Sequence, residues 1–161
     1  KVFGAKIIVW GSENSRKKAV EDGYEQSETK EHFFKNADII TLHLRLTDKT
    51  HGIVNKTDLL SMKENSVLIN TARAELIEKG GLQNVLKSGK NIFIGVDVYE
   101  NEPIYDKNFE LLKMKNVVCT PHLGYVEKNG YELYFGKAFE NVINFINGNP
   151  SNIANPEALN K

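Results

Sequence analysis

The sequence predicts an α/β protein built on a doubly wound parallel sheet. Five short apolar runs, rich in β-branched residues, are separated by stretches with helical spacing. The runs occupy residues 7–10, 39–42, 66–69, 92–96 and 117–119. Each run is nearly continuous rather than alternating, which is typical of strands that helices cover on both faces. Strands that alternate with helices along the chain favour a parallel sheet.

Four stretches between and after these runs have the spacing of amphipathic helices. They cover residues 29–36, 55–62, 82–86 and 128–147. Ser27 precedes the first stretch and is of a type that caps helices, and Gly148 is a stop signal after the last. We expect their apolar side chains to be buried. These side chains are Phe33, Phe34, Leu59, Leu60, Met62, Leu82, Val85, Leu86, Leu133, Phe135, Ala138, Val142 and Phe145.

The start of the chain departs from the usual order of a Rossmann-type sheet, which opens with a strand and a glycine-rich turn. The sequence contains no G-x-G-x-x-G, and residues 1–4 resemble the end of a helix that leads into a strand. We therefore expect a nucleotide-binding type of domain over residues 1–148, incomplete at its N-terminus. Residues 149–161 form a tail that we expect to be extended or docked on another domain.

Charge and cysteine content give little support to several classes of protein. The 161 residues include 21 Lys and Arg and 21 Asp and Glu, so the formal net charge is zero and indicates neither nucleic acid nor an anionic membrane as a partner. The single cysteine, Cys119, lies in an apolar run and is expected to be a buried strand residue. With no signal-peptide pattern and no membrane-length apolar run, a cytoplasmic location is the simplest expectation.

Polar or ionisable side chains follow four of the five apolar runs. These are His43, the segment 70–73, Asp97 and His122. Because ligands of open α/β sheets bind beyond the carboxyl ends of the strands, we expect these side chains to meet at one rim.

Four segments, in order and with matching spacing, resemble the D-isomer-specific 2-hydroxyacid dehydrogenases. They are residues 41–47 (TLHLRLT), 68–73 (LINTAR), 95–103 (GVDVYENEP) and 120–124 (TPHLG). The resemblance covers about residues 1–150. It implies an NAD(P)-dependent oxidoreductase that interconverts a D-2-hydroxy acid and its 2-keto acid.

The resemblance assigns catalytic roles to three residues. Arg73 corresponds to the arginine that binds the substrate carboxylate, a task that suits a planar guanidinium fork. His122 corresponds to the acid–base residue, because imidazole titrates near neutral pH. Glu102 corresponds to the carboxylate that orients this histidine and favours its charged form. No metal site is implied.

The cofactor-side residues follow from the same resemblance. They are Ser12, His43, Thr47, Thr71, Ala72, Asp97 and Gly124. For Asp97 alone, a role in a turn or a helix cap remains an alternative. Gly11 stands where NAD-preferring members carry an aspartate, so Ser12 and Arg16 could accept the 2′-phosphate of NADP. The other possibility is that Arg16 begins a solvated helix.

The resemblance further implies a small 2-keto or 2-hydroxy acid substrate and a homodimer. Two alternatives stay open. One is a dinucleotide-binding regulatory protein, similar to the C-terminal-binding corepressors, which share these residues. The other is a remnant that is catalytically weak or inactive, since the glycine-rich turn and the substrate domain are absent from this sequence.

Overall fold

The computed structural model describes residues 2–160. The chain divides into two compact units, the first ending at His122 and the second beginning at Leu123. Among the described residues, the first unit carries all the strands, and the second carries the long helix and the tail. The predicted domain boundary at residue 148 stays a prediction. No helix within residues 2–160 is long and apolar enough to cross a membrane.

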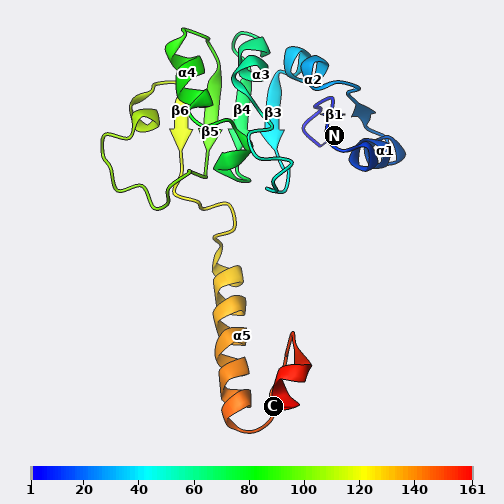
Figure 1. Ribbon diagram of the computed structural model, residues 1–161, viewed down its shortest axis with the longest axis vertical. Helices are drawn as coiled ribbons and strands as arrows, with labels where there is room; N and C mark the ends of the chain where they lie inside the picture. The colour runs from blue at the N-terminus through cyan, green and yellow to red at the C-terminus, as the bar shows by residue number, and fades with distance from the viewer. Residues whose placement is uncertain (1, 161) are drawn as a thin grey trace. The chain divides into compact units, whose positions relative to one another are not determined.

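The strands of the first unit form two parallel sheets. The larger has the order β3 (Ile39–Leu42), β4 (Val67–Asn70), β5 (Phe93–Val96), β6 (Val117–Cys119). The smaller pairs β1 (Ile8–Val9) with β2 (Glu25–Gln26). The arrows of the larger sheet all point the same way in Figure 1, so their carboxyl ends share one rim. The α/β class and parallel strands are as the sequence predicts.

Within residues 2–160, five α-helices and three short 3₁₀ helices connect and follow the strands. They are α1 (Glu13–Glu21), α2 (Lys30–Asn36), α3 (Lys56–Ser61), α4 (Gly81–Lys87), α5 (Lys128–Ile146), η1 (Ala74–Leu76), η2 (Glu110–Lys113) and η3 (Pro156–Asn160). The cap of α2 is Thr29, whose side chain accepts the N–H of His32. The prediction of Ser27 as the cap was therefore wrong, because its hydroxyl instead donates to the Thr29 carbonyl.

The core of the first unit lies on one face of the larger sheet. Phe34 from α2, Leu59 from α3 and Val85 from α4 pack with alternate strand residues. On the other face, Phe93 is 47% exposed and Val118 is 66% exposed. The prediction that helices bury both faces was wrong for the described residues. Strand side chains alternate between faces, so helices on one face bury only every second residue.

Two smaller expectations about burial also fail. Leu60 is exposed although Leu59 and Met62 are buried, because α3 turns Leu60 away from the sheet. Cys119 is only partly buried, since β6 pairs with a strand on one side only among the described residues.

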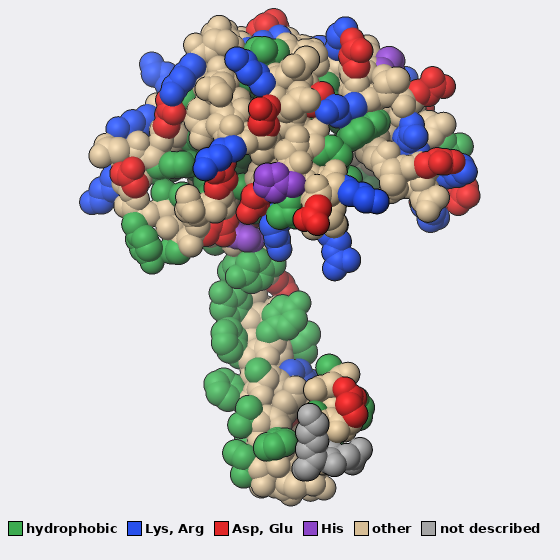
Figure 2. Space-filling model, in the orientation of Figure 1, with side chains coloured by type: hydrophobic (Ala, Val, Ile, Leu, Met, Phe, Trp, Pro, Cys, Tyr) green, Lys and Arg blue, Asp and Glu red, His purple; other side chains and the backbone are tan. Residues whose placement is uncertain are grey.

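Helix α5 has the predicted bounds to within one residue but not the predicted burial. Leu133, Phe135, Val142 and Phe145 are exposed, and no described residue of α5 is buried. Figure 2 shows hydrophobic side chains along this helix. The tail is not simply extended, because it contains η3 and because the Asn152 side chain donates to Asn141 of α5.

Candidate active site

The carboxyl rim of the larger sheet brings together residues far apart in the sequence (Figure 1). His43 follows β3, Arg73 follows β4, Glu102 lies in the loop after β5, and His122 follows β6. The carboxyl ends of parallel strands lie at the same edge of a sheet, so the residues that follow them converge there, as the sequence predicts.

Asn70 holds the backbone of the loop after β4 that carries Arg73. It is buried at the last position of the strand. The Asn70 side chain accepts the backbone N–H of Ala72 at 3.1 Å and donates to the Arg73 carbonyl at 2.9 Å. The Arg73 side chain is itself exposed at the rim, where Nη1 donates to the Ala72 carbonyl at 2.6 Å. The backbone of Arg73 is thus held in place while its guanidinium faces outward.

Glu102 and His122 form a direct pair. Nδ1 of His122 lies 2.6 Å from Oε2 of Glu102, and both side chains are about one-third exposed, at 33% and 32%. An ionised carboxylate only accepts hydrogen bonds, so Nδ1 carries the proton of this contact. The carboxylate therefore holds the orientation of the His122 ring.

The surroundings of Glu102 favour its ionised form. The hydrogen bond from His122 is the main cause that holds the pKa of Glu102 below its ordinary value, and partial burial opposes this shift. The backbone N–H of Tyr99 and the positive charge of Arg73 lower this pKa further. Arg73, Glu102 and His122 consequently interact as one electrostatic group, although they come from three different strand ends.

Asp97 is a buried carboxyl group at the end of β5, with 4% exposure. Its Oδ1 accepts the hydroxyl of Thr120 at 2.5 Å, a bond that ties the ends of β5 and β6 together. This bond supports the alternative that Asp97 has a role in the local structure. A contact between Asp97 and a cofactor stays a prediction.

The other predicted cofactor-side residues lie at separate places. Thr71 and Ala72 follow β4, and the His43 ring contacts the Thr41 hydroxyl at 3.0 Å. Thr47 lies in the loop after β3, where its backbone N–H donates to Thr50. Gly124 belongs to the second compact unit.

Ser12 lies beyond β1 and caps α1 by accepting the N–H of Ser15. Exposed hydroxyl and imidazole groups at Ser12, His43 and Thr71 suit a ligand rich in hydroxyl and phosphate groups, such as a dinucleotide.

Arg16 is less available to such a ligand than the sequence suggests. Its Nη1 donates to the carbonyl of Glu28 at 2.8 Å, which joins α1 to the segment before α2.

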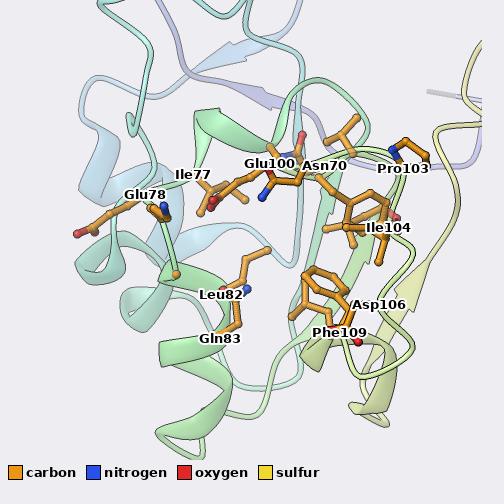
Figure 3. Close-up of a pocket in the computed structure, with 18 of the residues that line it drawn as sticks. Asn70, Ile77, Glu78, Leu82, Gln83, Glu100, Pro103, Ile104, Asp106 and Phe109 are labelled. Carbon is orange, nitrogen blue, oxygen red and sulfur yellow. Dashed lines mark hydrogen bonds between the residues drawn. The ribbon is translucent and has the colours of Figure 1, made fainter.

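A cavity of about 420 Å³ lies within the first unit, between α4 and the loop after β5. Figure 3 shows Leu82 and Gln83 of α4 on one side and Ile104 and Phe109 of the loop after β5 on the other. Arg73, Glu102 and His122 are not among the residues that line it. The cavity is therefore not the place where these three side chains meet.

Sequence reasoning alone missed Tyr99 and the role of Thr120. The Tyr99 hydroxyl lies 2.9 Å from the carbonyl oxygen of Thr120, and the backbone N–H of Tyr99 donates to Glu102. A tyrosine three residues after a strand is a usable signal, because a partly buried phenol normally finds an acceptor. Which acceptor it finds depends on the fold.

Residues 1–124 match the family model described as "D-isomer specific 2-hydroxyacid dehydrogenase, NAD binding domain". A glyoxylate reductase from Thermococcus litoralis is 36% identical over 160 residues, which is 99% of this chain and 47% of that protein. The chain thus spans about half the length of this curated relative.

Solved structures agree with this match. The phosphoglycerate oxidoreductase from Vibrio cholerae O395 is 55% identical with a TM-score of 0.85, over 91% of this chain and 47% of that one. D-lactate dehydrogenase from Aquifex aeolicus, solved with NAD and lactic acid, is 27% identical with a TM-score of 0.70, over 92% of this chain and 48% of that one.

Proposed function

The chain belongs to the D-isomer-specific 2-hydroxyacid dehydrogenase family as its NAD-binding domain, and we propose that the whole protein interconverts a D-2-hydroxy acid and its 2-keto acid. The observation that carries this proposal is the 2.6 Å contact between His122 Nδ1 and Glu102 Oε2, with the charge of Arg73 close enough to lower the pKa of Glu102. An acid–base pair and a carboxylate-binding cation at one rim are what this reaction requires.

Each member of the group has one task in the proposed reaction. Arg73 binds the substrate carboxylate with its guanidinium fork and polarises the neighbouring carbonyl. His122, oriented by Glu102, gives a proton to the keto oxygen in reduction and takes one from the hydroxyl in oxidation. A bound nicotinamide supplies the hydride in reduction and accepts it in oxidation.

The residues proposed to contact NAD or NADP are Ser12, His43, Thr47, Thr71, Ala72, Asp97 and Gly124. Their hydroxyl groups, rings and backbone would hold the dinucleotide along the rim so that its reacting ring faces the substrate. We also propose that the protein forms a homodimer and acts in the cytoplasm, as the family resemblance and the single cysteine indicate.

Turnover by the full-length protein tests the proposed function. Glyoxylate, hydroxypyruvate and pyruvate would each be offered with NADH and with NADPH, and loss of the reduced cofactor followed by absorbance. We expect at least one acid to be reduced, with NADH used at least as well as NADPH because Arg16 is bound to the Glu28 carbonyl. Tight dinucleotide binding without turnover would contradict the proposal and favour a regulatory protein.

Replacing Glu102 by glutamine should lower kcat for keto-acid reduction about 10- to 100-fold. Glutamine keeps the size of the side chain but removes the carboxylate that orients the His122 ring, so the fall in rate caused by protonation of Glu102 at low pH should disappear. The pKa of Glu102 is lowered, so its carboxylate contributes above that value and is lost only as pH falls through it. A pH–rate profile of kcat measures both effects.

Glu100→Gln is the matched control for this experiment. Glu100 is exposed in the same loop, so its variant removes one negative charge without touching His122. We expect its pH–rate profile to follow that of the wild type. Equal profiles for the two variants would argue against a specific pairing of Glu102 with His122.

A further inference from the structure

Tyr99 connects the two segments that carry Glu102 and His122. Its backbone N–H donates to Oε1 of Glu102 at 2.7 Å. Its hydroxyl donates to the carbonyl of Thr120 at 2.9 Å, across a sequence separation of 21 residues. One residue therefore contacts the loop of the carboxylate and the turn of the histidine at the same time.

The carbonyl of Thr120 is also part of the turn that sets the direction of His122. It accepts the backbone N–H of His122 at 3.0 Å. His122 itself has φ = 57°, in the left-handed region that residues other than glycine seldom adopt. Such a conformation persists where surrounding contacts hold it, and the Thr120 carbonyl supplies one of these contacts.

Thr120 is anchored to β5 on its other sides. Its backbone N–H donates to the Val96 carbonyl at 3.0 Å, and its hydroxyl donates to Asp97 at 2.5 Å. The Tyr99 ring is fixed in turn against Phe109, edge to face, with ring centres 5.7 Å apart. These contacts give the hydroxyl of Tyr99 a defined position rather than a mobile one.

The Tyr99 hydroxyl remains a donor over the working pH range. Burial, together with the neighbouring Cys119, raises the pKa of Tyr99 above its ordinary value. The negative charges of Asp97 and Glu102 act in the same direction. The phenol therefore keeps the proton that it donates to Thr120.

We propose that Tyr99 is a positioning residue, which holds the Thr120–His122 turn through its hydroxyl and so keeps the His122 ring against Glu102. The effect on catalysis rests on the proposed function, whereas the effect on the Glu102–His122 contact does not. The ionisable groups that face Glu102 are His122 from the end of β6 and Arg73 from the end of β4. The Tyr99 hydroxyl holds the turn that carries His122, whereas Arg73 lies on a different loop.

Tyr99→Phe in the full-length protein removes the hydroxyl and keeps the ring that packs on Phe109. We expect kcat for keto-acid reduction to fall about 10- to 100-fold, since small displacements of an acid–base group cost this much. The KM for the keto acid should change little, because Arg73 is untouched. The Glu102 carboxylate, followed by ¹³C NMR, should titrate at higher pH, because the His122 hydrogen bond is the main cause of its lowered pKa.

Tyr105→Phe is the matched control, because Tyr105 lies in the same loop and is 86% exposed. Tyr99→Leu, which also removes the ring, should lose activity together with Tyr99→Phe. The proposal is overturned if Tyr99→Phe matches Tyr105→Phe in kcat and in the Glu102 titration while Tyr99→Leu alone is impaired. It is also overturned if Tyr99→Phe lacks the wild-type circular dichroism spectrum, since the hydroxyl would then serve the fold as a whole.

The two measurements separate this inference from the proposed function. A wild-type protein without turnover would contradict the proposed function, and the Glu102 titration would still decide whether Tyr99 positions His122. A wild-type protein with turnover, together with an unchanged Glu102 titration in Tyr99→Phe, would contradict the positioning role alone.

Discussion

Replacing Arg73 by alanine should lower kcat/KM for a 2-keto acid by about 30- to 4,000-fold, because truncating one partner of a hydrogen-bonded charge pair costs about 2–5 kcal/mol. The guanidinium is exposed at the rim while its backbone is braced by Asn70, so the loss should come from binding rather than from unfolding. Arg73→Lys should recover only part of the rate, because an ammonium lacks the planar fork. Steady-state kinetics with both variants measure these effects.

A substrate without a charged carboxylate gives the sharpest control for Arg73. The amide of the same keto acid should be a poor substrate of the wild type, and Arg73→Ala should lower its kcat/KM much less. Lys107→Ala removes a positive charge from the exposed part of the loop after β5 and should leave the kinetics unchanged. An equal loss for acid and amide would show that Arg73 does not bind the carboxylate.

Replacing His122 by asparagine should lower kcat about 100- to 10,000-fold, the usual contribution of a positioned acid–base group. Asparagine is chosen because His122 has φ = 57°, and asparagine tolerates this left-handed conformation better than most residues. The substitution therefore removes the imidazole and largely spares the turn. Single-turnover measurements of keto-acid reduction would test the chemical step directly.

The binding of the reduced cofactor serves as the control for His122→Asn. The imidazole contacts Glu102 and is proposed to move a proton rather than to bind the dinucleotide, so the Kd measured by cofactor fluorescence should stay close to that of the wild type. A variant that binds the cofactor normally and retains most of its kcat would refute the acid–base role of His122.

The strands of the larger sheet were predictable because buried strands leave a local signal. The apolar runs locate β3, β4, β5 and β6 to within one residue. The small strand β2 (Glu25–Gln26) was missed because both of its residues are polar and exposed. Burial was predicted less well, since continuous apolar runs do not reveal which face a helix covers, and Phe93 and Val118 lie on the open face.

Linked motifs in the sequence were enough to propose three catalytic residues, but not to predict the contacts that hold them in place. Arg73, Glu102 and His122 stand in segments whose order and spacing are specific to one family. The bond from Tyr99 to Thr120 depends on how β5 and β6 pair, which no local pattern in the sequence contains. The engagement of Arg16 with the Glu28 carbonyl was likewise hidden, because it depends on how α1 packs beside β2.

The open face of the larger sheet also governs how this chain behaves at high concentration. Phe93 and Val118 are exposed there, and Phe135 and Phe139 are exposed on α5 in the other unit. The formal net charge is zero at pH 7, so electrostatic repulsion between molecules does little to oppose the association of these apolar surfaces. Colloidal association should be strongest near neutral pH, and protein concentration must therefore be matched whenever variants are compared.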